Sequence, residues 1–323
     1  MARAATGLPF DDIRRLIDGP PLPDIEAGDK VRAATAGLGR LGETAEWLAA
    51  WQGKSTPAIT QPLVAVFAAN HKIVERGVSH EPMSATQDIV ELVAAGGKPV
   101  SRAAMQSNVG LKVFDLALDL PTPDIVEADA LDEAACAATM AFGMEAIAGG
   151  ADLLCVSDIG IGNRTVAAAL AMALFGGMPS DWLPDMEEKA LWETQHEAVK
   201  LAVARLGIGQ HKQLRDPLEI MRRVGGREFA AIAGAVVAAR YQRIPVLLDG
   251  MVAVTAAAVL HELGPNMVAH CRVTDSGADK GLSNLLTYLK MEPLLKVGLA
   301  ENHGLGGILA IDLCRTAVIA VQP

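Results

Sequence analysis

Two glycines, Gly160 and Gly162, lie between an apolar run at residues 152–156 and a helix-forming segment at residues 166–173. Glycines at this spacing allow a tight turn from a buried strand into a helix and leave backbone N–H groups exposed at the helix N-terminus. Such a helix start is an anion site, most often for phosphate. An ordinary strand-to-helix turn has the same pattern, so the glycines alone leave both interpretations open.

A second polar, glycine-rich turn at residues 298–307 precedes the apolar segment at residues 308–311 and contains Glu301 and His303. One interpretation is a helix start with an exposed carboxylate. The other is a carboxylate or imidazole held over a ligand pocket by a flexible backbone. An imidazole suits proton transfer near neutral pH, because its unperturbed pKa is about 6.5.

The elements that must position these turns alternate between strands and helices, which predicts a parallel sheet with right-handed crossovers. Continuous apolar runs predict buried strands at residues 62–69, 111–116, 153–156, 244–249 and 267–270. The helices expected among them span residues 85–95, 136–148, 165–174, 227–240 and 252–263.

Ligands bind beyond the carboxyl ends of the strands in sheets of this type. Polar residues that directly follow predicted strands should therefore converge on one edge of the sheet. These residues are Asn70, His71, the segment 158–163, Asp249, Gly250 and the segment 270–275.

Composition narrows the classes of protein and partner. The 323 residues suffice for one large α/β unit or two modest domains, and the net charge of −10 argues against a nucleic-acid partner. No stretch approaches the ~18 apolar residues of a membrane span, and the N-terminus has no signal-peptide core. The scattered cysteines favour buried free thiols in a reducing cytoplasm. They are Cys136, Cys155, Cys271 and Cys314.

Ordered motifs along nearly the whole chain match one known family. They include LGRL at 38–41, VAVFAANH at 64–71, GVS at 77–79, GLKVFDLAL at 110–118, ATMAFGMEAIAGG at 138–150, GIGN at 160–163, DPLE at 216–219, VGGRE at 224–228 and PVLLDG at 245–250. In these segments the chain resembles the nicotinate mononucleotide:dimethylbenzimidazole phosphoribosyltransferases, which assemble the lower ligand of cobalamin.

The resemblance implies a transfer of ribose phosphate from nicotinate mononucleotide to a benzimidazole-type base, giving α-ribazole phosphate and nicotinate. It also implies a Rossmann-like α/β domain, a parallel sheet with helices on both faces, over residues 60–285. Residues 1–59 and 286–323 would form a smaller helical domain. A homodimer is expected, with no metal or other cofactor and with neither nucleic acid nor membrane as partner.

The family's functional residues map onto particular positions of this chain. The nucleotide's phosphate, ribose and nicotinate would contact Asp158, Ile159, Gly160, Ile161, Gly162, Asn163 and Lys200. His303 or Glu301 would be the catalytic base. The acceptor pocket would be formed by Ser79, His80, Glu81 and Asp88.

Departures from the family pattern fall within these positions. Where the family reads Gly-Glu-Met-Gly-Ile-Gly-Asn-Thr-Thr, this chain has SDI at 157–159 and Arg164 in place of a threonine. An ungapped alignment puts His303 at the family's catalytic glutamate, and a shift of two residues would put Glu301 there instead. Around the acceptor pocket, HEP at 80–82 and QD at 87–88 stand where the family often has an aromatic-proline pair and a glutamine.

These departures leave three interpretations. The first is a working phosphoribosyltransferase with a remodelled pocket. The second is a catalytically inactive homologue that serves as a nucleotide-binding or partner subunit. The third is a transferase for a different azole or a phenolic acceptor, which would fit the altered acceptor pocket.

Overall fold

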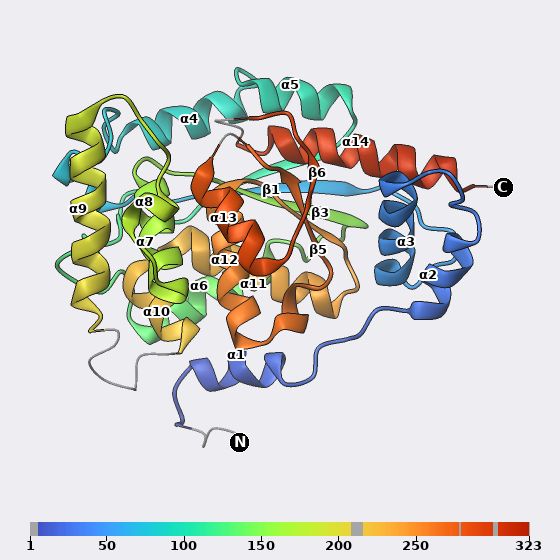
Figure 1. The fold of residues 1–323 in the computed structure, drawn as a ribbon, viewed down its shortest axis with the longest axis horizontal. Coiled ribbons are helices and arrows are strands. Elements are labelled where there is room, and N and C mark those ends of the chain that lie inside the picture. Colours follow the sequence, from blue (N-terminus) through green and yellow to red (C-terminus); the bar gives the residue numbers. More distant parts are fainter. Residues whose placement is uncertain (1–5, 208–215, 278, 300–302, 323) are drawn as a thin grey trace.

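The computed structural model describes residues 6–207, 216–277, 279–299 and 303–322. Its centre is a six-stranded sheet in the order β2-β1-β3-β4-β5-β6, and each neighbouring pair is parallel (Figure 1). The strands are β1 (Pro62–Ala68), β2 (Gly110–Asp115), β3 (Leu153–Ile159), β4 (Val246–Leu248), β5 (Cys271–Asp275) and β6 (Pro293–Leu295). The predicted α/β fold class is confirmed.

Four of the five predicted strands are confirmed as β1 to β4. The strand predicted at residues 267–270 is wrong, because Pro265–Val268 forms the 3-10 helix η2 and β5 begins only at Cys271. Proline at the first position of η2 fixes a backbone angle suited to a helical turn. Met267 and Val268 are buried by this turn, which accounts for the apolar run.

The two faces of the sheet carry different helices, because successive side chains of a strand point to opposite faces. Val64 and Val66 of β1 belong to one apolar cluster, and Ala65 and Phe67 belong to the other. The first face is covered by α3 (Arg40–Gln52), α4 (Ala85–Ala94), α5 (Pro99–Gln106) and α14 (Leu305–Ala320) (Figure 1). The second cluster includes α6 (Glu133–Glu145), α7 (Asn163–Phe175), α10 (Pro217–Val224), α11 (Arg227–Tyr241), α12 (Gly250–Leu263) and α13 (Lys280–Leu289).

All five predicted helices are confirmed, with ends displaced by three residues or fewer, as α4, α6, α7, α11 and α12. The remaining elements are α1 (Phe10–Ile17), α2 (Ile25–Arg32), η1 (Lys72–Arg76), α8 (Pro179–Trp182) and α9 (Lys189–Arg205). Within the described ranges, no helix is long and apolar enough to cross a membrane.

Small residues let α6 and α11 approach each other closely. A Cβ atom on Gly143 would lie 1.9 Å from the carbonyl oxygen of Ala231, and one on Gly234 would lie 1.9 Å from that of Met140. Neither position has space for a side chain, so the backbones themselves are in contact. The glycine- and alanine-rich composition therefore serves close helix packing on this face of the sheet.

Segments from the two ends of the chain meet at α3 and α14. Val31, Ala45 and Ala49 form a small apolar cluster with Ala317 of α14. The guanidinium of the buried Arg240 lies 4.0 Å from the ring centroid of Trp51, which ties α3 to α11. The division at residue 285 stays a prediction; that position lies inside α13, and the later strand β6 joins the main sheet.

Candidate active site

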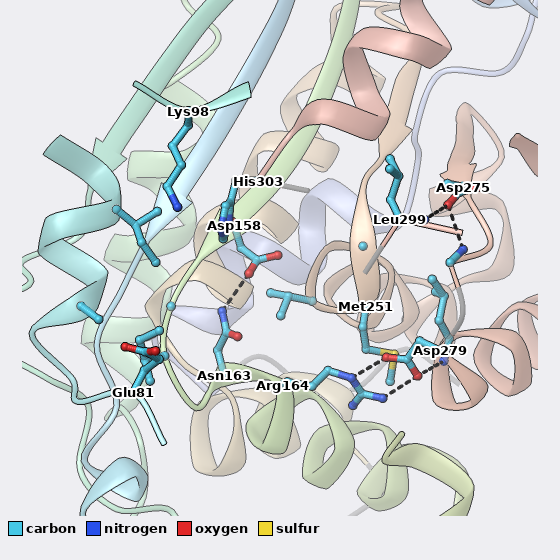
Figure 2. A pocket seen from close by; sticks show the side chains of 18 of the residues that line it. Glu81, Lys98, Asp158, Asn163, Arg164, Met251, Asp275, Asp279, Leu299 and His303 are labelled. Carbon is cyan, nitrogen blue, oxygen red and sulfur yellow. Dashed lines mark hydrogen bonds and ion pairs between the residues drawn. The ribbon is translucent and has the colours of Figure 1, made fainter. Parts of the chain in front are cut away.

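A cavity of about 620 Å³ lies beyond the carboxyl ends of the strands. Asp158 reaches it from β3, Gly250 from the segment after β4, and Asp275 from β5. His303 lines it from the residues just before α14 (Figure 2). The predicted convergence at this edge of the sheet is confirmed for Asp158, Gly250 and Asp275.

His270 was expected at the same edge, and that expectation is wrong. Because β5 starts at Cys271, His270 precedes the strand instead of following it. It is buried at the opposite end, with Nε2 3.0 Å from the carbonyl oxygen of Val236. Burial and the nearby Arg240 lower its pKa to about 3, so it stays neutral.

The turn between β3 and α7 depends on its glycines. Gly162 has φ +80°, a left-handed conformation that favours glycine, and it directly precedes α7 without a side-chain cap. A Cβ atom on Gly160 would lie 2.9 Å from the carbonyl oxygen of Ala69. Gly160 and Ile161 line the cavity next to the first residue of α7, Asn163. The N-terminus of α7 thus faces the cavity in the manner of an anion site.

Asp158 lies between this turn and His303. Its Oδ2 accepts a hydrogen bond of 2.8 Å from Nδ2 of Asn163 (Figure 2). Burial raises the pKa of Asp158 to about 7, against the effect of the Asn163 bond, and the carboxylates of Glu228 and Asp249 raise it further. Near neutral pH this side chain therefore exchanges a proton readily.

His71 and Glu228 form a buried pair just after the end of β1. Nε2 of His71 lies 2.6 Å from Oε1 of Glu228, and Nδ1 lies 2.8 Å from the hydroxyl of Thr122. His71 and Glu228 are almost completely buried. Asn70 and His71 follow β1 as predicted, but neither lines the cavity.

The backbone at His303 is strained. Its φ is +43°, a conformation that is uncommon for a residue with a side chain, and Gly304 follows with φ +101°. Nδ1 of His303 lies 3.4 Å from the carbonyl oxygen of Asp158. A carbonyl only accepts, so the contact favours the tautomer with the proton on Nδ1 and makes Nε2 the acceptor nitrogen. Strain of this kind is concentrated at functional sites.

Two carboxylates at neighbouring strand ends hold the chain on both sides of His303. Asp275 accepts hydrogen bonds from the backbone N–H groups of Val297, Gly298 and Leu299 at 2.6–3.0 Å. Asp249 accepts a hydrogen bond from the hydroxyl of Thr274.

The start of α14 also depends on Asp249. Burial raises the pKa of Asp249 to about 6, and hydrogen bonds from the hydroxyl of Thr274 and from the backbone N–H groups of Gly307 and Gly304 oppose the rise. The carboxylate thereby caps the N-terminus of α14.

Arg164 and Asp279 form an ion pair on the far wall of the cavity (Figure 2). Nε of Arg164 lies 2.6 Å from Oδ2 of Asp279, and Nη2 lies 2.7 Å from Oδ1. Nη2 also donates to the carbonyl oxygen of Trp182 at 2.6 Å. The residue that departs from the family's threonine thus links α7 to the segment before α13.

The residues predicted from sequence divide into two groups. The first group lines the cavity and consists of Asp158, Gly160, Ile161, Asn163, Glu81, Asp88 and His303. The second group does not line it and consists of Ile159, Gly162, Ser79, His80 and Lys200. Glu301 lies outside the described residues.

Lys200 and His80 have other partners. Lys200 is exposed on α9, where Nζ lies 3.4 Å from Oε2 of Glu197. His80 is exposed, with Nε2 2.7 Å from Oε2 of Glu188. Neither side chain is among those that enclose the cavity, so the phosphate-binding role predicted for Lys200 has no support from its position.

Sequence reasoning placed Asp275 at this edge without a specific role, assigned no site role to Lys98 or Asp279, and marked Arg164 only as a departure; all four line the cavity. Only Lys98 carried a local signal, because it follows Gly96 and Gly97 and precedes Pro99 at a helix start. In the described part of the chain, no group of three or more His, Cys, Asp or Glu side chains could hold a metal ion.

The parallel sheet and the cavity at its carboxyl edge define an α/β protein with a small-molecule site next to a glycine turn. A family model described as phosphoribosyltransferase matches residues 26–322. The chain is 47% identical over 324 residues to the nicotinate-nucleotide–dimethylbenzimidazole phosphoribosyltransferase of Brucella melitensis biotype 1, covering 98% of this chain and 95% of the relative. The relative of the same description from Brucella anthropi shows the same identity and coverage.

A solved structure of a protein with the same description, from Thermus thermophilus, has a TM-score of 0.84 and 30% identity. The match covers 92% of this chain and 96% of that chain. The chain therefore belongs to this family of phosphoribosyltransferases, which are enzymes of the glycosyltransferase class.

Proposed function

We propose that the protein transfers the ribose phosphate of nicotinate mononucleotide to dimethylbenzimidazole, which yields α-ribazole phosphate and nicotinate, as in cobalamin assembly. The relatives described above are named for these two substrates. The observation that carries the proposal is that the glycine turn, Asp158 and His303 enclose one cavity. A phosphate, a ribose and a base thus have adjacent places in a single site.

The nucleotide's phosphate is assigned to the glycine turn. Gly160, Ile161 and the first residue of α7 face the cavity, and the helix N-terminus favours negative charge there. Arg164, the second residue of α7, lines the same side of the cavity, where Asp279 balances its charge. The nicotinate nucleotide then has its ribose near Asp158, whose carboxylate stabilises positive charge that develops on the sugar.

The proton of the acceptor is assigned to His303. As one ring nitrogen of the benzimidazole attacks C1′ of the ribose, the bond from C1′ to nicotinate breaks and the configuration inverts. The other ring nitrogen loses its proton to Nε2 of His303, while Nδ1 points to the carbonyl oxygen of Asp158. General-base catalysis of this kind contributes ~10²–10⁴-fold in rate.

The decisive experiment is to incubate the purified protein with nicotinate mononucleotide and dimethylbenzimidazole and to quantify nicotinate by chromatography. We expect nicotinate release that depends on both substrates. His303→Ala should reduce kcat by roughly 10²–10⁴-fold and leave the KM for nicotinate mononucleotide nearly unchanged, because the base contacts the acceptor.

His261→Ala is the matched control. His261 lies near the C-terminal end of α12, on the order of 15 Å from Gly250 at the end that lines the cavity. This control should keep full activity. Absence of nicotinate release from the wild-type protein, beside an active relative assayed in parallel, would favour the inactive-homologue interpretation.

We extend the proposal to assembly and location, with a homodimer in the cytoplasm. The described cysteines are all buried free thiols, as expected in a reducing compartment. Light scattering coupled to size-exclusion chromatography should give twice the chain mass of 33.8 kDa.

A further inference from the structure

Charged side chains at one end of the cavity form an ion pair, and those at the other end form none with any described residue. At one end Arg164 and Asp279 neutralise each other, and Asp275 accepts several backbone hydrogen bonds. At the other end Lys98 and Glu81 have no ion pair with any described residue. Figure 2 shows Asp158 and His303 between these two ends.

Lys98 has a fixed backbone and a side chain directed into the cavity. It occupies the N-cap position of α5, with φ −93° and ψ 155°, and its carbonyl oxygen accepts from the backbone N–H groups of Ser101 and Arg102. The side chain is half-buried, and its ammonium points toward His303 and Asp158 (Figure 2). The ammonium thus lies on the Glu81 side of Asp158 and His303.

The carboxylates around Lys98 do not cancel its charge within the described structure. Glu81 and Asp88 are exposed to solvent, which screens them, and neither lies within ion-pair distance of the ammonium. Asp158 also lines the cavity, and its carboxylate bonds to Asn163. A half-buried cation without a counter-charge stabilises negative charge on a neighbouring ligand.

We propose that Lys98 determines acceptor specificity, in that its ammonium favours ring acceptors that carry a negative charge. The charge can lie on the reacting atom, as in a deprotonated azole or phenol, or on a ring carboxylate. The inference rests on the proposed function, because it takes the Lys98 end of the cavity as the acceptor end.

For an acceptor charged at the reacting atom, the transfer balances simply. The N–H or O–H proton passes to His303 Nε2, and the electron pair left on the acceptor forms the new bond to C1′. The electrons of the broken C1′–N bond stay on nicotinate. Lys98 stabilises the acceptor anion, and no proton leaves or joins Lys98.

The test measures equilibrium binding by calorimetry to the wild-type protein, Lys98→Met, Lys98→Arg and the control Lys189→Met. Lys189 is an exposed lysine at the start of α9, outside the cavity lining. The probes are neutral benzimidazole, benzimidazole-5-carboxylate and 4-nitrophenolate, which separate a charged substituent from a charged reacting atom. Thermal unfolding checks that each variant is folded.

We expect wild-type protein, Lys98→Arg and Lys189→Met to bind at least one anionic probe roughly tenfold more tightly than benzimidazole. Lys98→Met should lose that preference and bind benzimidazole within about twofold of wild type. The inference is overturned if the wild type shows no preference, if Lys98→Met keeps it, or if all three probes weaken equally. Preference without nicotinate release contradicts only the proposed function, and release without preference contradicts only this inference.

Discussion

The raised pKa of Asp158 makes the free energy of unfolding depend on pH. The folded protein holds this proton up to about pH 7 because the carboxyl group is buried near Glu228 and Asp249. The unfolded chain releases it near pH ~4. Between these values the folded state binds more protons, so this residue lowers stability as pH rises.

Asp158→Asn should therefore raise the melting temperature relative to wild type above pH 7, by about 1–2 °C for each ~1 kcal/mol recovered. The difference should shrink toward pH 4, where the wild-type carboxyl is protonated in the folded protein and about half-protonated in the unfolded chain. Differential scanning calorimetry from pH 4 to pH 8 measures it. Asp12→Asn is the control, because that carboxylate is 75% exposed. A difference that is independent of pH contradicts the assignment.

The sequence predicted part of the site at this scale. Spacing and glycine content were enough to locate the turn at Gly160 and Gly162 and to mark His303, because local chain geometry constrains both turns. Lys98 could not be assigned by the same reasoning, because it reaches the cavity from a separate loop. Lys200 was a candidate for the phosphate only because it is a lysine near the expected position. Its exposure to solvent depends on how α9 packs, which the sequence pattern did not show.

The first turn of α14 packs directly against strand β3 of the sheet. A Cβ atom on Gly307 would lie 2.2 Å from the Sγ atom of Cys155 on β3. Gly307→Ala should therefore lower the free energy of unfolding by about 1–3 kcal/mol, as overpacking does in well-packed cores. Urea denaturation followed by circular dichroism measures the loss.

Two further variants test the cause. Cys155→Ala combined with Gly307→Ala removes the sulfur and should recover part of the loss, since the two sites are in contact. Gly19→Ala is the control, because a Cβ atom there would meet nothing within 4 Å. If the double variant is no more stable than Gly307→Ala, then the contact with sulfur is not the cause.

The errors in strand prediction have a physical explanation. Strand β5 contains Arg272 and Asp275, whose charges hide it from a search for apolar runs. Arg272 is accommodated by its contact with the ring of Trp47, 5.3 Å from guanidinium carbon to ring centroid, which only the packed structure provides. Strands β1, β3 and β4 have buried apolar runs, and β2, which carries Lys112 and Asp115, lies at the edge of the sheet where its charges reach solvent.

For the molecule as a whole, His270 contributes a pH dependence opposite to that of Asp158. Its pKa is lowered to about 3 by burial in the fold, whereas the unfolded residue titrates near ~6.5. As pH falls between these values the unfolded chain gains a proton that the folded protein does not bind. This residue therefore lowers stability progressively toward acid pH.

His270→Gln should lower the melting temperature at pH 7 through lost packing, but the deficit should narrow as pH falls from 6.5 toward 3. Thermal unfolding across that range, with the partly exposed His261→Gln as control, measures the trend. A deficit that widens toward acid pH would show that the buried imidazole accepts a proton in the folded protein.

The overall architecture was the most predictable level. Alternating strands and helices determine a parallel sheet, and the parallel sheet determines which edge holds the site. The division into two domains stays a prediction, because α3 and α14 pack together while β6 extends the main sheet. Sequence periodicity indicates where each helix or strand lies, but it does not show that N-terminal and C-terminal helices pack against each other.

Asp249 and Asp275 have a consequence for how this site can change over evolutionary time. Asp275 accepts hydrogen bonds from backbone N–H groups before position 303, and Asp249 accepts them from backbone N–H groups after it. These bonds do not depend on the side chain at position 303. The position of the backbone at residue 303 is therefore set independently of the side chain that acts as the base. A single substitution there, such as His303→Glu, would exchange one proton acceptor for another while the hydrogen bonds to the backbone on both sides stay in place, which makes position 303 a practical point for redesign.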